Sequence, residues 1–310
     1  MDAGVKTRTG ICILVLSLFG IFGNLNIVIA ILRKKNFRSK SGLLIGLIAV
    51  YDLICLIFEC TVAVRDILRI ELSSIECFKA VVVYYVVQFV SASTLIGLAV
   101  DRLVAVTFPF SYATHHVGYT LALSTLPGLM ISVGFAIAAA FFLEDNGKLS
   151  PVCFPVSMLP NFMQIYSGWC LFVMNAAVVV LYIAAFTSLH IQKRRISIKY
   201  NSQLKNTLQN QEKAMKSITV FLAVFLFTWF LFQFELTVMP LFEVPDTWIF
   251  NAIRATTPLT LIVAFSQCYY VYFWRSREYR EAFLEQLGYG RWKKKAELRR
   301  SETRSTVTQF

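Results

Sequence analysis

The sequence predicts an all-α fold: an integral membrane bundle of seven transmembrane helices, with an amphipathic cytoplasmic helix after the seventh span. Composition is the first reason. Of the 310 residues, 57% are hydrophobic and only 15% are charged, whereas a soluble domain carries about 25% charged residues. The mean hydropathy of +0.62 also excludes a disordered chain. The second reason is a set of seven apolar runs, each near the roughly 20 residues that a helix needs to cross a bilayer.

The seven runs follow one another with short polar links between them. They cover residues 10–32, 42–64, 78–100, 119–143, 165–189, 217–242 and 255–274. The first, fourth and fifth runs carry no charged side chain, and the second contains Asp52 and Glu59. We assign 1–9 to a short extracellular tail, 10–274 to the seven-transmembrane helix domain, 275–287 to an amphipathic interfacial helix and 288–310 to a disordered basic cytoplasmic tail.

The distribution of Lys and Arg predicts the orientation of the chain. With seven spans, the first, third and fifth links lie on the same side as the C-terminal tail, and these segments hold 23 of the 30 Lys and Arg residues. Cytoplasmic segments carry this excess, so we expect a multi-pass plasma-membrane protein with an extracellular N-terminus and a cytoplasmic C-terminus. Basic helix ends that face an anionic leaflet account for the net charge of +12 better than a nucleic-acid partner does.

Polar side chains inside the spans are expected to face the interior of the bundle, because a charge near the bilayer centre is costly. Asp52 lies in the middle of its span, Asn24 in the first span could bond it, and Ser91 lies at similar depth in the third span. This polar core either holds helices together or acts as a switch or ion site. Glu235 and Arg254 lie near the outer ends of their spans. They either neutralise each other or frame a ligand pocket.

Two charged residues close the third span on its cytoplasmic side. Asp101 and Arg102 are adjacent there and are followed by Leu103. One interpretation is an ordinary water-facing border of the helix. The other is a switch, in which Asp101 holds the Arg102 guanidinium until the carboxylate is protonated and releases it.

Cysteines at the outer face predict a disulfide. Cys77 begins the third span and Cys153 lies in the link between the fourth and fifth. Both are on the oxidising side of the membrane, where disulfides persist. A bridge between them would hold the outer link across the mouth of the bundle. The other five cysteines lie in apolar runs and are interpreted as small hydrophobic residues.

The segment after the seventh span has the pattern of an amphipathic helix. Tyr279, Phe283, Leu284 and Leu287 fall on one helical face, with charges opposite, and Gly288 ends the helix. Such a helix is expected to lie on the inner leaflet. The tail beyond it contains several Ser and Thr residues and is a candidate for phosphorylation, with arrestin as a possible partner.

These features together resemble the rhodopsin-like G-protein-coupled receptors. The matching positions are Gly23 and Asn24, 48–52, Cys77, Asp101 to Leu103, Phe225 with Trp229, and the helix at 275–287. Some positions depart from the family pattern. Gly128 stands near the expected Trp of the fourth span, Leu231 replaces the Pro after Trp229, and 268–272 ends in Tyr272 but lacks the usual Asn-Pro. The last departure makes a sodium site around Asp52 doubtful. The set of departures is most similar to nematode serpentine chemoreceptors of class SX.

The resemblance implies a ligand at the outer mouth and a heterotrimeric G protein beside Arg102, with Asp101, Leu103 and Tyr272 in the switch. The amine receptors of the family carry an Asp where this chain has Tyr84, and 255–274 lacks the Lys that would bind retinal. We therefore expect a chemosensory receptor for a small odorant-like molecule or a short peptide. The intramembrane polar core comprises Asn24, Asp52, Ser91 and Trp229. The candidate ligand-binding residues are Tyr84, Tyr85, Gln88, Phe232, Gln233, Glu235 and Arg254.

An enzyme and a transporter are the alternatives to a receptor. With only three His residues and no Ser-His arrangement or paired mid-membrane carboxylates, the sequence predicts no enzyme, no metal site and no cofactor. A transporter for a small solute is the stronger alternative. However, many transporters have repeated halves with interrupted midplane helices, and no such repeat is evident here.

Overall fold

The computed structural model describes residues 3–108, 112, 114, 116–143, 149–150, 153, 160–197, 220, 223–225, 227–232, 234 and 248–288. Nearly all of these residues are helical. The first five long helices are α1 (Ala3–Arg33), α2 (Lys40–Leu68), α3 (Ser74–Thr107), α5 (Val117–Phe142) and α6 (Asn161–Ser197). All five are long and apolar enough to cross a membrane, and they coincide with the first five predicted spans.

The last two predicted spans are described to different extents. The seventh corresponds to α8 (Trp248–Arg275). The sixth, at 217–242, lies partly outside the described residues, and the part at 227–232 is helical. Helix α1 begins seven residues before the predicted first span, so the helix continues into the predicted tail. Where the membrane boundary falls remains a prediction.

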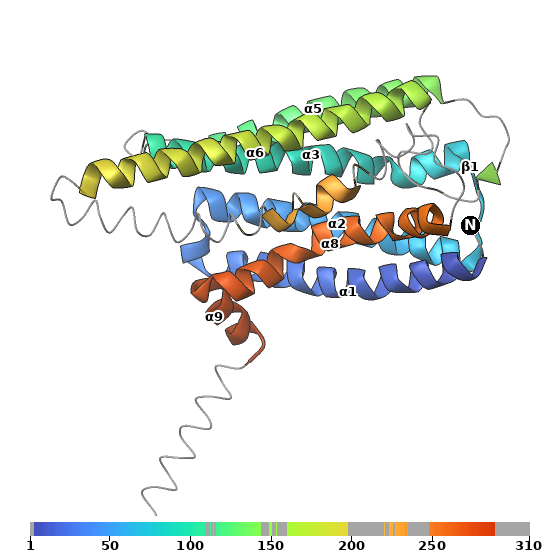
Figure 1. Ribbon diagram of the computed structural model, residues 1–310, viewed down its shortest axis with the longest axis horizontal. Coiled ribbons are helices and arrows are strands. Elements are labelled where there is room, and N and C mark those ends of the chain that lie inside the picture. Colours follow the sequence, from blue (N-terminus) through green and yellow to red (C-terminus); the bar gives the residue numbers. More distant parts are fainter. Residues whose placement is uncertain are drawn as a thin grey trace, which may run out of the picture.

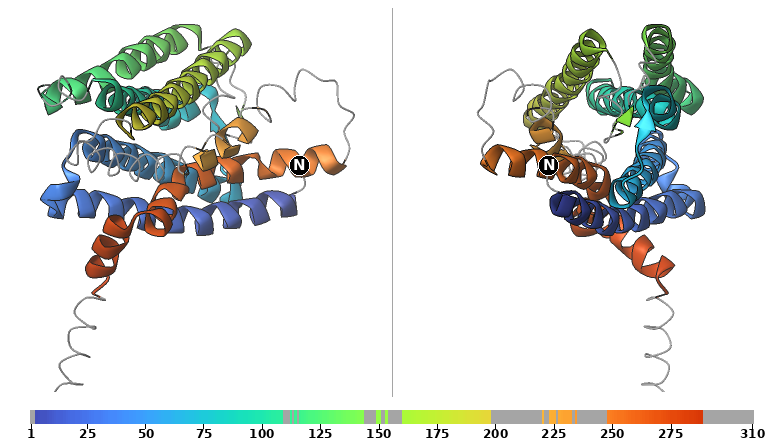
Figure 2. Two further views of the ribbon diagram at one scale, coloured as in Figure 1. Left: turned by 60° about the vertical axis from the view of Figure 1, so that its left-hand side comes forward. Right: turned by 90° about the vertical axis from the view of Figure 1, so that its right-hand side faces the viewer.

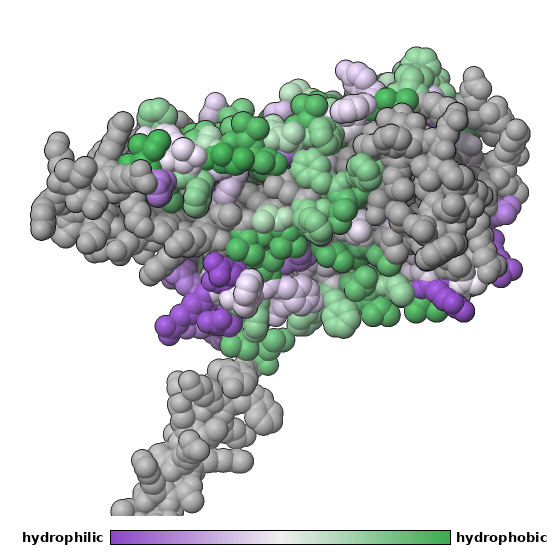
Figure 3. Space-filling view, in the orientation of Figure 1, coloured by the Kyte–Doolittle hydropathy of each residue, from purple (hydrophilic) through white to green (hydrophobic). Residues whose placement is uncertain are grey.

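Helix α3 is the central element of the bundle. It contacts α2, α5 and α6, while α1 packs against α2 and α8 (Figures 1 and 2). In the most apolar stretch of α3, 67% of the residues are buried, whereas in that of α5 only 17% are buried. Phe141 and Met130 on α5 are 84% and 68% exposed, and hydrophobic residues cover much of the described surface in Figure 3. Such a surface is suited to lipid rather than water.

One end of the bundle is closed by a short strand pair and a disulfide. Strand β1 (Leu72–Ser73) pairs antiparallel with β2 (Leu149–Ser150), which the sequence did not predict. The Ser73 side chain then caps α3 by accepting a hydrogen bond from the Glu76 amide, and Glu76 bonds back to the Ser73 amide. Cys77 and Cys153 form the predicted disulfide. We call this the disulfide end, and the opposite end, where Arg102 lies, the Arg102 end.

Helix α5 approaches α3 closely around a proline. Pro127 lacks an amide hydrogen and interrupts the hydrogen-bond ladder of α5. Ser93 of α3 bridges the interruption, because its hydroxyl donates to the Ser124 carbonyl (2.8 Å) and accepts from the Gly128 amide (3.2 Å). A Cβ at position 128 would lie 2.7 Å from the Phe89 carbonyl oxygen. The close contact therefore requires glycine at that position.

The predicted amphipathic helix is α9 (Arg277–Gln286), capped by the Ser276 side chain. It lies at the end of the bundle opposite the first residues of the chain (Figure 1). Its apolar face packs against the protein, because Phe283 is fully buried and the Tyr279 ring stacks on Phe37 of η1 (Lys35–Phe37) at 4.4 Å. Leu287 is 54% exposed. Only part of the predicted apolar face is thus free to contact a membrane.

Candidate functional site

The first candidate site surrounds Arg102, where α3 meets the start of α2. Arg102 forms an ion pair with Asp101, with Nη2 2.7 Å and Nε 3.2 Å from Oδ2. The hydroxyl of Ser41 donates to the same oxygen at 2.7 Å. The Asp101 side chain is fully buried and that of Arg102 is 13% exposed. Adjacent residues on one helix thus pair, and α2 supplies a third group that fixes the carboxylate.

Residues beyond the end of α3 complete this site. The Tyr112 carbonyl accepts a hydrogen bond from Lys40, whose ammonium also lies 4.1 Å from the centre of the Tyr112 ring. Burial raises the pKa of the Tyr112 phenol, the nearby Asp101 charge raises it further, and Arg102 opposes the shift. Tyr112 therefore stays neutral at physiological pH and lies near the ion pair. The sequence analysis did not identify Tyr112, because hydropathy gives no signal for a single polar contact in a link.

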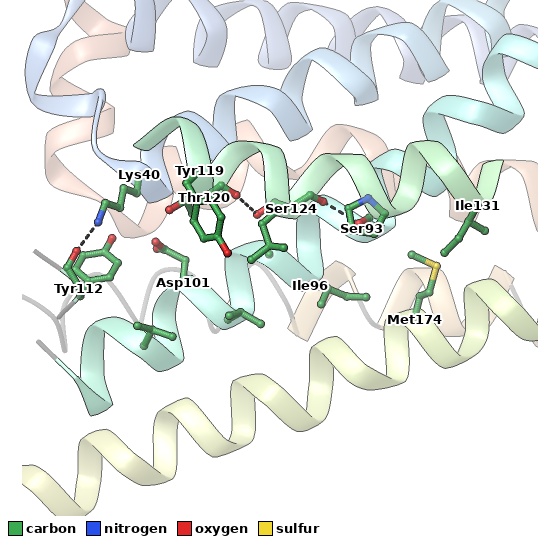
Figure 4. A pocket seen from close by; sticks show the side chains of 15 residues that line it. Lys40, Ser93, Ile96, Asp101, Tyr112, Tyr119, Thr120, Ser124, Ile131 and Met174 are labelled. Atoms are coloured by element: carbon green, nitrogen blue, oxygen red, sulfur yellow. Dashed lines mark hydrogen bonds between the residues drawn. The ribbon is translucent and has the colours of Figure 1, made fainter. Parts of the chain in front are cut away.

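A cavity of about 460 Å³ borders the ion pair. Figure 4 shows Lys40, Tyr112 and Asp101 at one end of it, and Ile131 and Met174 at the other. Its walls come mainly from apolar residues of α3 and α5. The cavity extends from Asp101 along α3 and α5 as far as Met174 of α6.

Tyr272 of α8 lies on the other side of the Arg102 site. It is 2% exposed, and its ring centre is 4.8 Å from that of Tyr279 in α9. Arg102 is close enough to act electrostatically on both tyrosines. Leu103, the third residue of the predicted switch, is half-buried and packs against the main hydrophobic core. The structure therefore gathers Asp101, Arg102 and Tyr272 at one end of the bundle.

The predicted polar core is buried but not bonded as expected. Asn24 donates to the Phe265 carbonyl at 2.9 Å rather than to Asp52, because it faces α8. Asp52 and Ser91 are 5% and 8% exposed, and neither forms a hydrogen bond within the described part of the chain. Trp229 is 3% exposed and belongs to the main core. Among the residues that the structure describes, no group of three potential ligands could hold a metal ion.

The second candidate site lies nearer the disulfide end, around Tyr84. Tyr84 is 2% exposed and shares a buried cluster with Phe232 and Phe265. Its ring meets those of Phe58 and Phe265 edge to face, with centroids 6.2 and 6.5 Å apart. Glu59 of α2, also 2% exposed, lies beside the Tyr84 phenol. The sequence analysis placed Glu59 in the second span but not in a site.

Of the remaining predicted ligand residues, some lie on α3, and the side chains of the others lie outside the residues that the structure describes. Tyr85 is 5% exposed and faces the other way, toward Phe89 and Phe135, because successive helical residues are about 100° apart. Gln88 is 9% exposed. Gln233, Glu235 and the side chain of Arg254 lie outside the described residues. The structure therefore brings Tyr84 and Phe232 together and separates Tyr85 from them.

Comparison with known proteins identifies the family. A family model described as serpentine type 7TM GPCR chemoreceptor Srsx matches residues 17–287, which is most of the chain. The chain belongs to this receptor family. The match confirms the predicted seven-transmembrane fold and multi-pass membrane location, and the family is not an enzyme class.

The receptor is similar in sequence to two dopamine receptors. It is 27% identical over 186 residues to the D(2) dopamine receptor A of Xenopus laevis, covering 59% of this chain and 41% of that receptor. It is 23% identical over 197 residues to Dopamine receptor 3 of Caenorhabditis briggsae, covering 63% of this chain and 32% of that receptor. The matched regions thus span less than half of each relative.

Proposed function

We propose that this receptor is a chemosensory protein of the plasma membrane that binds a small molecule or a short peptide near its disulfide end. Ligand binding activates a heterotrimeric G protein at the Arg102 end. The excess of Lys and Arg on one side of the spans supports an extracellular disulfide end and a cytoplasmic Arg102 end. Both named relatives are called dopamine receptors, which favours a small ligand.

The Arg102–Asp101 ion pair is the observation that carries this proposal. Asp101 holds Arg102 through two hydrogen bonds and receives a third from Ser41. In a buried setting such charge-assisted bonds are strong. The structure therefore has the features expected of a resting state, in which the guanidinium is held inside the bundle and is unavailable to a partner protein.

Activation then follows from a two-state equilibrium. A ligand shifts the balance only through its different affinities for the two states. In the active state Arg102 leaves Asp101 and contacts the G protein, while Tyr272, at the same end of α8, rearranges with it. Phosphorylation of the Ser- and Thr-containing tail and binding of arrestin would end the signal.

The test is a ligand screen in heterologous cells that express a promiscuous G protein. Arg102→Ala should reach the cell surface and bind ligand, but its response should be lost. Arg277→Ala is the matched control, because Arg277 is 83% exposed and pairs only with Glu281 on α9 among the described residues. A full response from Arg102→Ala would contradict the proposal. Accumulation of labelled ligand in vesicles without any G-protein response would favour a transporter instead.

A further inference from the structure

Glu59 is a buried carboxyl group that forms no ion pair with any residue that the structure describes. It lies in a membrane-spanning helix, 2% exposed, and its Oε2 atom has no hydrogen-bond partner among the described residues. No Lys or Arg in that part of the chain forms an ion pair with it. A carboxylate in such a place is costly unless a cation compensates it. Among the described residues, the ionised form of Glu59 therefore has no compensating cation.

An aromatic cluster lies beside this carboxyl group, with Tyr84 as the member next to it. The Tyr84 phenol is next to it, although the contact falls short of hydrogen-bond geometry and the Tyr84 hydroxyl also lacks a partner among the described residues. Phe58 and Phe265 meet the Tyr84 ring edge to face, and Phe232 belongs to the same cluster. Aromatic faces attract ammonium groups, most strongly where water is excluded.

The electrostatic surroundings also favour a cation. Asp66, on the same helix, acts on Glu59 with a like charge, and Asp52 lies two turns away on the same face of α2. When ionised, these carboxyl groups repel one another. An anionic ligand would be repelled, whereas an ammonium group would relieve the repulsion.

The position suits a ligand that enters from the disulfide end. Tyr84 follows Cys77 by seven residues of helix, a depth of about 10 Å. Phe265, which touches Tyr84, has its carbonyl held by Asn24 in the polar core. Tyr84 and Phe265 thus connect a group bound beside Glu59 to Asn24 in the polar core.

We propose that Glu59 is the counter-ion for the ammonium group of a small amine ligand, with Tyr84, Phe58 and Phe265 forming the aromatic wall around it. This assignment rests on the proposed receptor function. It specifies that the small ligand, whose charge the proposed function leaves open, is a cation. Glu59 accepts a hydrogen bond from the ammonium group, and the Tyr84 hydroxyl adds a second polar contact.

The test measures binding to the purified full-length receptor as thermal stabilisation, without any G protein. The probes are two pairs of compounds. Tyramine is compared with 4-ethylphenol, which lacks the amino group, and 3-methylbutylamine is compared with 3-methylbutanol, in which a hydroxyl replaces the amino group. At least one amine should stabilise the wild-type receptor more than its uncharged partner does. Glu59→Gln should weaken amine binding about 30-fold or more, the usual effect of removing one member of a buried charge pair.

Matched variants separate loss of charge from loss of folding. Glu59→Asp keeps the charge and should retain part of the affinity, while Tyr84→Phe keeps the ring and should lose less than Glu59→Gln. The proposal is wrong if neither amine surpasses its uncharged partner, or if folded Glu59→Gln binds the amine as the wild type does. Arg102→Ala should bind the amine normally. Failure of G-protein activation is therefore distinguishable from failure of amine recognition.

Discussion

A methyl group at position 128 tests the packing of α5 on α3. The Cβ of Gly128→Ala would lie 2.6 Å from Ser93 Cβ, 2.7 Å from the Phe89 carbonyl oxygen and 2.9 Å from Val90 Cα. Two of these atoms belong to the backbone, so no side-chain rotation relieves the clash. Helix α5 must move away, and Ser93 then loses its bonds to the interrupted ladder of α5. Overpacking and two weakened hydrogen bonds together should cost about 2–4 kcal/mol.

The assay is thermal unfolding of purified receptor in detergent, followed with a dye that reacts with buried cysteines as they become exposed. Gly134→Ala is the matched control on the same helix, because a Cβ there meets nothing within 4 Å. Alanine favours a helix over glycine by about 1 kcal/mol, so this variant should unfold at the wild-type temperature or above it. If Gly128→Ala were as stable as Gly134→Ala, the assigned close contact of α3 and α5 would be wrong.

Three further predictions follow from individual contacts. The unfolding temperature should fall equally in Cys77→Ser, in Cys153→Ser and in the double variant, because each removes the same bridge across a separation of 76 residues. The expected loss of stability is up to about 4 kcal/mol. A larger loss in the double variant would argue against the bridge. Phe283→Ala should cost about 3–5 kcal/mol and speed hydrogen exchange throughout α9, whereas Leu287→Ala, at a position 54% exposed, should not; equal exchange in both would contradict the docking of α9. Asn24→Ala should lower the unfolding temperature by removing a buried hydrogen bond between α1 and α8, a cost of about 0.5–1.5 kcal/mol, and an unchanged temperature would contradict that bond.

The sequence predicts helices well where long apolar runs decide the structure. Each of the first five spans coincides with a helix, because no other backbone arrangement satisfies its polar groups in lipid. The pair Cys77 and Cys153 was also predictable, since the two residues share one side of the membrane. The β1–β2 strand pair was not, because two-residue strands carry no periodic signal.

Contacts between helices depend on rotation about each helix axis, which hydropathy does not determine. Asn24 was a candidate to bond Asp52 but donates to the Phe265 carbonyl. Tyr84 and Tyr85 were placed in one pocket but face different neighbours, Phe265 and Phe135. These errors share a cause, since depth in the membrane follows from sequence position while facing direction does not.

Glu59 was within reach of sequence reasoning. It follows Asp52 by seven residues, a spacing that places both carboxyl groups on one face of a helix. A second carboxylate on the interior face of the same span indicates a functional site with a partner for the charge. Tyr112, by contrast, required the structure, because only the fold brings it over Asp101.

The central claim is that Asp101 restrains Arg102 and that release of Arg102 activates a G protein. The most direct measurement is nucleotide exchange on a G protein by purified receptor in lipid nanodiscs, without ligand. Asp101→Asn should raise exchange about 10-fold or more, from the loss of a charge-assisted pair, and Arg102→Ala should reduce it to the rate of the G protein alone. Equal exchange by the wild type and both variants would contradict the account.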